Sequence, residues 1–278
     1  TARKPREFDA NRLTTWANTQ TMTWNWTMLD AGRFALDGGS MFGVVPKALW
    51  SKLVEPDEQN RIPQACNCVL LERDGERVLI ECGYGDGWSD KEVDMYKMNG
   101  KTILDALASN DIDPDSINTI ILTHLHFDHA AGVSLLPNAK VVVQEQEWID
   151  ANNRRSTMQK TFLPRFLDSI LDRVQLVQGD TTIFDDVKLT NRVGHTWGLQ
   201  TVEFRDDSGT DCFVSDVMPT RNHIGLSYSM GYDMLPWDNM ASKKQLLEQA
   251  VDEEWRLVLY HEPNTPVVRV STDDRGRF

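Results

Sequence analysis

The chain has 278 residues, a length that fits one large domain or two small ones. Its 42 acidic residues against 29 basic ones leave a formal net charge of −13, so a polyanion would meet repulsion and general nucleic-acid binding is not expected. No apolar run approaches the roughly 18–20 residues that a membrane helix needs, which predicts a soluble protein without membrane contact.

The N-terminal region, residues 1–60, differs from the rest in its many tryptophan, threonine, asparagine and glycine residues. We predict an arm and loop region that packs on a core formed by residues 61–278, within one structural domain overall. Trp16, Trp24 and Trp26 are expected to make core or subunit contacts, and a homodimer through this region is one possibility.

A cytoplasmic location is the default expectation, because four cysteines are too few for a disulfide scaffold and are predicted to be reduced core residues. Residues 8–18 are too polar for the apolar stretch of a signal peptide, although Arg3, Lys4 and Arg6 resemble the start of one. An export leader removed before Thr1 stays open as an alternative.

The predicted elements begin with a hairpin, in which the apolar runs 68–72 and 77–82 flank the turn signal Asp74-Gly75. Short segments of alternating strand and helix character follow: strands at 117–122 and 141–143, helices around 103–107 and 148–149, and a helical insertion at 162–171. The chain then continues with strands at 187–193, 200–204, 211–215 and 256–260 and a helix at 243–251. Two successive blocks of mainly β structure with helices between them predict sheets covered by helices, an α/β class.

Three of the six histidines fall within the six residues His124-Leu125-His126-Phe127-Asp128-His129. As ordinary loop residues, these imidazole and carboxylate groups would repel one another when charged and need desolvation when neutral. A bound cation removes both problems, and these ligand types suit zinc first, with iron, manganese or cobalt as alternatives.

The position of this cluster at the end of the 117–122 strand is shared by three other polar residues. His195, Asp216 and His261 each follow an apolar run that we predict to be a strand. Sites in α/β proteins assemble at the carboxyl ends of strands, so four separate segments are expected to deliver ligands to one rim.

The motif series His124-x-His126-x-Asp128-His129, Gly194-His195, Ser215-Asp216 and His261 resembles the metallo-β-lactamase fold superfamily in its dinuclear hydrolase branch. The resemblance extends over roughly residues 67–263, and it implies a four-layer αββα sandwich of two mixed β-sheets flanked by helices. By this resemblance, 61–278 would be the hydrolase domain.

The resemblance also implies a set of seven metal ligands. One metal ion would be held by His124, His126 and His195, the second by Asp128, His129 and His261, with Asp216 bridging both. Two divalent cations, Zn²⁺ first, would then share a bridging hydroxide that attacks an ester-type bond of a small molecule, lactone or carboxylic ester first and phosphoester second. Asp128 would both bind metal and orient the nucleophile.

This sequence departs from the family pattern in two places. Glu81 stands where an aspartate usually supports a metal ligand, and it could supply the same carboxylate from one methylene further out. The acyl-homoserine lactone lactonases carry a substrate-contacting tyrosine just after the bridging aspartate, whereas this chain has Met218, Pro219 and Thr220. His223 lies in a stretch that could return over the metals, which would give it a catalytic, substrate-facing role or a supporting one; the alternative is a solvent-exposed loop histidine.

Three aromatic residues, Phe42, Trp88 and Trp197, could line an apolar pocket, although ordinary packing is the favoured interpretation for each. The alternative functions are thioester hydrolysis of the glyoxalase II type, mononuclear iron oxidation like that of persulfide dioxygenases, and a nuclease activity. The full ligand set disfavours the iron enzyme, and the charge of −13 disfavours the nuclease.

Overall fold

A computed structural model describes residues 23–157 and 159–278. Its strands form two sheets of six strands each. The first contains β1 (Asn25–Asp37), β2 (Arg61–Arg73), β3 (Glu76–Ile80), β4 (Thr119–Ile121), β5 (Lys140–Gln144) and β6 (Val174–Val177). The second contains β7 (Thr181–Ile183), β8 (Val187–Asn191), β9 (Gln200–Asp206), β10 (Gly209–Phe213), β11 (Arg256–Val258) and β12 (Val267–Val268).

Both sheets are mixed. In the first sheet β1, β2 and β3 pair antiparallel, while β3 to β6 run parallel. In the second sheet β7 to β10 pair antiparallel, β11 joins β10 in parallel and β12 pairs antiparallel with β11. One apolar core lies between the sheets, where Leu71 and Val142 of the first belong to the same buried cluster as Leu189 and Val202 of the second.

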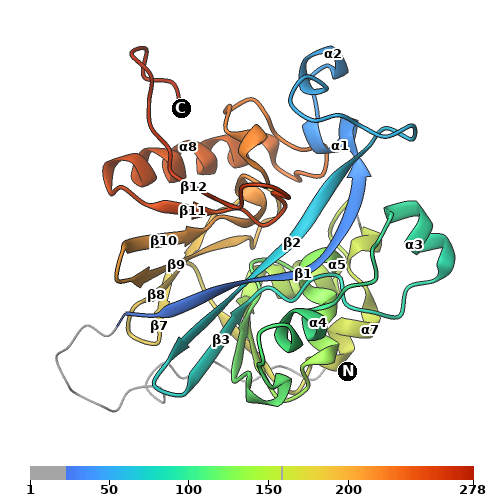
Figure 1. The fold of residues 1–278 in the computed structure, drawn as a ribbon, viewed down its shortest axis with the longest axis vertical. Coiled ribbons are helices and arrows are strands. Elements are labelled where there is room, and N and C mark those ends of the chain that lie inside the picture. Colours follow the sequence, from blue (N-terminus) through green and yellow to red (C-terminus); the bar gives the residue numbers. More distant parts are fainter. Residues whose placement is uncertain (1–22, 158) are drawn as a thin grey trace.

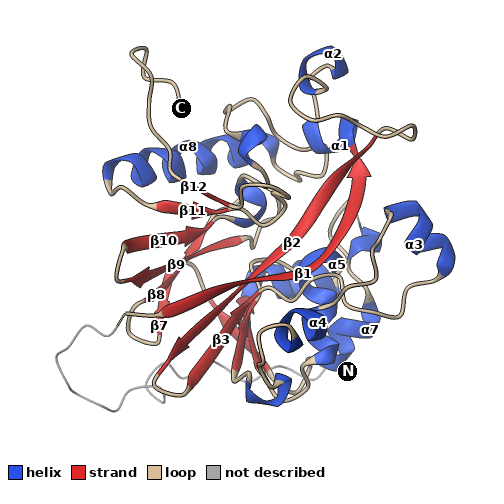
Figure 2. Ribbon diagram, in the orientation of Figure 1, coloured by secondary structure: helices blue, strands red, loops and turns tan. Residues whose placement is uncertain are grey.

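Helices cover the outer sides of both sheets (Figures 1 and 2). Leu246 and Leu247 of α8 belong to one buried cluster with Cys212 and Leu257 of the second sheet. The helices are α1 (Gly38–Phe42), α2 (Lys47–Trp50), α3 (Asp90–Tyr96), α4 (Ile103–Ala108), α5 (Phe127–Ala130), α6 (Glu145–Asn152), α7 (Pro164–Ser169) and α8 (Pro236–Asp252), with 3₁₀ turns η2 (Pro114–Ser116), η3 (Ala131–Leu135), η4 (Gln159–Thr161), η5 (Ser215–Val217) and η6 (Arg221–His223). The layers confirm the predicted αββα architecture.

The β1 strand was not predicted from the sequence. It pairs with β2 along most of its 13 residues, with a bulge between Asp30 and Arg33. The bulge breaks the two-residue alternation of buried and exposed side chains by which a strand is identified. Gly32 makes the bulge possible, because a Cβ there would lie 2.6 Å from the carbonyl oxygen of Lys101.

The tryptophans at the start of β1 pack inside the chain. The Nε1 atom of Trp24 donates to Asp186 over 3.0 Å, and the guanidinium of Arg73 lies 4.0 Å from the centre of its ring. Trp26 packs edge-on against Phe204 at 5.9 Å. The homodimer that was one possibility for this region therefore gains no support from these two residues, and Trp16 lies outside the described residues. The boundary at residue 60 stays a prediction.

The described part of the chain contains no helix long and apolar enough to cross a membrane. All four cysteines are buried and unpaired, as predicted.

Candidate metal centre

All seven predicted ligands come together at the carboxyl ends of the strands. The loop after β4 carries His124 and His126, and α5 carries Asp128 and His129. The segment after β8 contributes His195, η5 after β10 contributes Asp216, and the segment after β11 contributes His261. Each of the seven side chains belongs to a residue that is no more than 7% exposed. The strand-end argument therefore predicted the location correctly.

The first group of ligand atoms consists of three imidazole nitrogens, from His124, His126 and His195. Nε2 of His124 lies 3.1 Å from Nδ1 of His126, and Nε2 of His195 lies 3.0 Å from the same atom. Nδ1 of His126 can share a hydrogen with only one of its two neighbouring nitrogens at a time. It therefore faces the other nitrogen without a hydrogen bond to it. A cation between the three would bind all of them.

The second group consists of Asp128, His129 and His261. The Oδ2 atom of Asp128 lies 3.5 Å from Nε2 of His261 and 3.9 Å from Nε2 of His129. This set combines one carboxylate oxygen with two imidazole nitrogens, which are ligands that zinc and related divalent metals accept.

The carboxylate of Asp216 lies between the two groups. Its Oδ2 atom is 3.2 Å from Nε2 of His195 in the first group. Its Oδ1 atom is 3.3 Å from Nε2 of His261 and 3.5 Å from Nε2 of His129 in the second. One oxygen therefore faces each group, which is the arrangement that a carboxylate needs to bridge two ions.

The residues present fit bound metal. Nε2 of His129 and Oδ1 of Asp216 are buried without a hydrogen-bond partner among the described residues. Burial, together with the neighbouring imidazoles, holds the pKa of His124 and His126 well below its usual value, so both rings are neutral as metal ligands must be. Orphaned buried polar atoms are costly, and a cation would satisfy them.

The outer nitrogens of these histidines are held by the surrounding chain. Nδ1 of His195 lies 2.8 Å from Oδ1 of Asp233, and Nδ1 of His261 donates to the carbonyl oxygen of Ala65 over 3.0 Å. Such contacts fix the ring orientation of a metal ligand. Asp233 was missed in the sequence, because a single aspartate in the segment 224–235 shares no spacing with the histidine motifs.

Two buried glutamates support the loop that carries His124 and His126. Oε1 of Glu81 accepts from the backbone N–H of Thr123 over 3.1 Å and lies 3.4 Å from Nδ1 of His129. This position supports the suggestion that the Glu81 carboxylate holds a metal ligand in place. The backbone of Glu81 is in the left-handed region at φ 62°. Glu147 on α6 accepts from the N–H of Leu125 over 2.9 Å, and no motif or spacing in the sequence pointed to this residue.

His223 does not face the substrate side of the centre. Its ring is fully buried, its Nδ1 atom lies 2.8 Å from the hydroxyl of Thr220, and its Nε2 atom donates to the carbonyl oxygen of Met41 over 2.9 Å. The ring also stacks on Phe42 at 4.7 Å. With both nitrogens in use inside the protein, the predicted catalytic role of His223 does not fit the geometry.

A small pocket of about 80 Å³ lies directly over the metal centre. Its walls are mostly apolar and aromatic, and its base includes four of the predicted ligands. The lining residues are Leu36, Met41, Tyr96, His126, Phe127, Asp128, Thr161, His195, Asp216, Met230 and Tyr232. Phe42, Trp88 and Trp197 are not among them, which agrees with the packing roles favoured for these three. Tyr96 and Tyr232 were missed, since neither lies near a recognisable motif.

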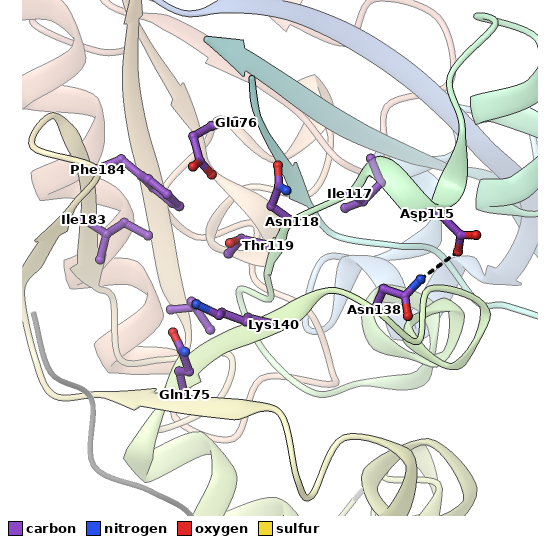
Figure 3. A pocket seen from close by; sticks show the side chains of 11 residues that line it. Glu76, Asp115, Ile117, Asn118, Thr119, Asn138, Lys140, Gln175, Ile183 and Phe184 are labelled. Atoms are coloured by element: carbon purple, nitrogen blue, oxygen red, sulfur yellow. Dashed lines mark hydrogen bonds between the residues drawn. The ribbon is translucent and has the colours of Figure 1, made fainter. Parts of the chain in front are cut away.

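A larger pocket of about 350 Å³ opens at the other end of the first sheet (Figure 3). Thr119 and Lys140, the first residues of β4 and β5, line it together with Asn118 and Gln175. None of the predicted ligands borders it, and most of its polar residues are exposed at the surface. Its size alone does not make it the reactive site.

Comparison with known proteins places this centre in a family. A family model described as the metallo-beta-lactamase superfamily matches residues 61–261. An N-acyl homoserine lactonase of Bacillus thuringiensis is 27% identical over 169 residues, which cover 56% of this chain and 65% of the relative. The chain thus spans 65% of the length of that relative. Another from a Bacillus species is 26% identical over 206 residues, which cover 70% of this chain and 76% of the relative.

Among solved structures, a probable metal-dependent hydrolase from Staphylococcus aureus superposes with a TM-score of 0.84 at 25% identity, covering 93% of this chain and 96% of that one. A dizinc quorum-quenching lactonase in complex with its product superposes with a TM-score of 0.78 at 18% identity, covering 92% and 94%. The second likeness shows a shared fold.

Proposed function

The chain belongs to the metallo-beta-lactamase superfamily, and we propose that it is a metal-dependent hydrolase that cleaves an ester-type bond in a small molecule. The observation that carries this proposal is Asp216, whose two oxygens face two separate groups of metal-ligand atoms. A centre built for two ions suits hydrolysis, because a pair of metal ions can serve both the attacking and the leaving oxygen.

We propose that His124, His126 and His195 hold one ion, that Asp128, His129 and His261 hold the other, and that Asp216 bridges them. Zinc is the first candidate for both positions, since imidazole nitrogen dominates the ligand set. When bound, the two ions would supply a hydroxide nucleophile near neutral pH and polarise the carbonyl oxygen of the substrate.

The residues of the chain contribute position and environment. The backbone carbonyl of Asp128 accepts from the buried hydroxyl of Tyr260 over 2.5 Å, which fixes the short helix α5 that presents Asp128 and His129. The walls formed by Leu36, Met41 and Met230 would exclude bulk water from the reacting bond, which strengthens electrostatic interactions there. Asp128 would hold the nucleophile in line with the carbonyl carbon.

Lactones and carboxylic esters are the first substrates to test, with phosphoesters second. Two observations support this order: the curated relatives are named as N-acyl homoserine lactonases, and the pocket over the centre is apolar and small. A site for highly charged phosphoesters would be expected to carry lysine or arginine, and neither lines this pocket.

The function can be tested with protein prepared without chelator and then reconstituted with zinc, manganese or cobalt. A panel of chromogenic carboxylic esters, lactones, phosphoesters and a cephalosporin is assayed against each form, and the chelated enzyme is the control. We expect hydrolysis of at least one ester or lactone that disappears on chelation and returns with metal. Protein that holds two metal equivalents yet hydrolyses none of the panel would refute the proposal.

A further inference from the structure

The pocket over the metal centre contains one hydroxyl group with unused hydrogen-bonding capacity. Of the lining residues, Tyr96, Thr161 and Tyr232 carry hydroxyls. The side chain of Ser40 lies within hydrogen-bonding reach of the hydroxyl of Tyr232, and Thr161 has an interaction of its own. Within the described residues, the hydroxyl of Tyr96 has no hydrogen-bond partner, although its ring is half-buried.

The ring of Tyr96 is held next to the metal-binding loop. It packs against Phe127 at 5.3 Å and against Trp88 at 6.3 Å, and these two rings contact each other at 5.1 Å. Phe127 lies between the proposed ligands His126 and Asp128 in the sequence. Packing among the three rings therefore holds the Tyr96 side chain in a defined place relative to the metal centre.

The backbone that carries Tyr96 is also fixed. Tyr96 is the last residue of α3, and Lys97 ends the helix in the left-handed conformation at φ 51°. The guanidinium of Arg61 donates to the carbonyl oxygens of Asp94 and Met95 over 2.7 and 3.2 Å. A phenol on such a support is preorganised, so a hydrogen bond to a ligand costs little conformational entropy.

We propose that Tyr96 is a substrate-binding residue of this site, whose hydroxyl donates a hydrogen bond to the carbonyl oxygen of the ester beside the metal centre. This inference rests on the proposed hydrolase function. A tyrosine phenol ionises only at about pH 10, so Tyr96 keeps its proton and can donate at neutral pH. Because charge develops on the carbonyl oxygen during attack, the bond is stronger in the transition state than in the bound substrate.

The test compares Tyr96→Phe with the parent enzyme on the best ester of the panel. We expect kcat/KM to fall about 10–100-fold, with most of the loss in kcat, while metal content and melting temperature stay unchanged. Tyr84→Phe is the matched control, because the hydroxyl of Tyr84 donates to Asn99 over 2.8 Å and does not line the pocket. Its kinetics should equal those of the parent.

A second measurement does not depend on turnover. Butyrate offers a carboxylate oxygen in place of the ester carbonyl, and its affinity for the zinc-loaded proteins can be measured by calorimetry. We expect Tyr96→Phe to bind butyrate roughly 10-fold more weakly than the parent and Tyr84→Phe to bind it equally well.

These outcomes separate the two proposals. Weaker butyrate binding by Tyr96→Phe in a protein that hydrolyses no ester would refute the hydrolase function and support the role of Tyr96 in binding. Unchanged kinetics and unchanged butyrate affinity in Tyr96→Phe would overturn the inference. A loss of activity and butyrate affinity in Tyr232→Phe but not in Tyr96→Phe would also overturn the inference, since Tyr232 would then be the donor.

Discussion

Among single residues, Asp216 has the most consequences for the centre because it contacts both ligand groups at once. Asp128 differs, since its side chain approaches only the second group. The backbone before Asp216 is strained as well, with Ser215 in the left-handed region at φ 48°. Strain of this kind persists where the surrounding structure over-determines a functional geometry, here the projection of one carboxylate between two sites.

We therefore predict different results for two variants. Asp216→Ala should lose metal and activity together, because both ions lose a ligand. Asp128→Asn should keep at least one equivalent of metal, held by the three histidines of the first group, but lose most turnover. Metal analysis and a kinetic assay on both variants check this, and substantial turnover in either one would show that the site is misplaced.

His223 is a buried structural residue whose protonation should matter for stability. Burial, reinforced by the nearby Lys243, lowers the pKa of His223 from 6.5 to about 4. The unfolded chain therefore binds more protons than the folded chain between pH 6.5 and pH 4. Stability from this residue is accordingly lost as the pH falls from 6.5 towards 4.

The prediction is that the free energy of unfolding of the parent falls more steeply below pH 6.5 than that of His223→Gln. At about 1.4 kcal/mol per pKa unit, the full difference amounts to about 3 kcal/mol. Denaturant unfolding at pH 7 and at pH 4.5 measures it, and metal release in acid affects both proteins alike. Equal slopes for the two proteins would contradict the buried neutral histidine, and a loss of metal at pH 7 would make His223 a ligand.

At the level of elements, the segment 224–235 between η6 and α8 shapes one side of the site. It contributes Met230 and Tyr232 to the pocket and Asp233 to His195. Lys243 of α8 holds its first half, because its buried ammonium donates to the carbonyl oxygens of His223, Gly225 and Tyr228 over 2.8–3.0 Å. Burial lowers the pKa of this ammonium to about 8.

Lys243→Met should therefore remove the ammonium donor from three carbonyl oxygens, of which that of Gly225 keeps the backbone N–H of Tyr228, and should destabilise the protein by about 3 kcal/mol or more. The loosened segment should also weaken the first metal site through Asp233. The matched control is Lys244→Met, because the neighbouring Lys244 is exposed and forms a surface ion pair with Glu248 at 3.5 Å. Its effect should stay within about 0.5 kcal/mol. Thermal melts and zinc titrations check both variants, and equal stability of the two would contradict the role of Lys243.

Across the whole molecule, the sequence predicted those parts that local pattern determines. The hairpin around Asp74-Gly75 and the short strands before each proposed metal ligand are confirmed as β2, β3, β4, β8, β10 and β11. The seven candidate ligands could be found because histidine is rare here and strand ends converge. β1 was not predicted because its bulge breaks the alternation of buried and exposed side chains. The start of α8 at Pro236 was placed too late, at 243, because the exposed Trp237 in its first turn hides the apolar periodicity of the helix.

The supports of the site could not be predicted, because they depend on contacts between distant segments. Asp233 contacts His195, which lies 38 positions earlier in the chain, and Glu147 contacts Leu125, which lies 22 positions earlier. A lone carboxylate that recurs at no regular interval gives no periodicity or spacing to detect. His223 was misassigned for the same reason, since its partner Met41 lies 182 positions away.

The metal centre also makes a prediction about the stability of the whole chain. Seven buried imidazole and carboxylate side chains converge from four segments of both sheets, so without ions the cost of desolvating them opposes folding, and bound ions stabilise only the folded state. Chelated protein should therefore melt at a lower temperature than zinc-loaded protein. Free zinc at 100 times its dissociation constant stabilises by about 2.7 kcal/mol per site, which raises the melting temperature by roughly 10 °C for the pair.

Calorimetric melts of chelated protein with rising zinc check this, and metal analysis of protein prepared without chelator should give close to two equivalents. Magnesium at equal concentration is the control, because it prefers oxygen ligands and these groups are mostly imidazole nitrogen. The melting temperature should rise with zinc until two equivalents are bound, and hardly at all with magnesium. Saturation at one equivalent of zinc would leave Asp216 as a ligand of a single ion. A melting temperature that zinc does not change would mean that the seven side chains hold no metal.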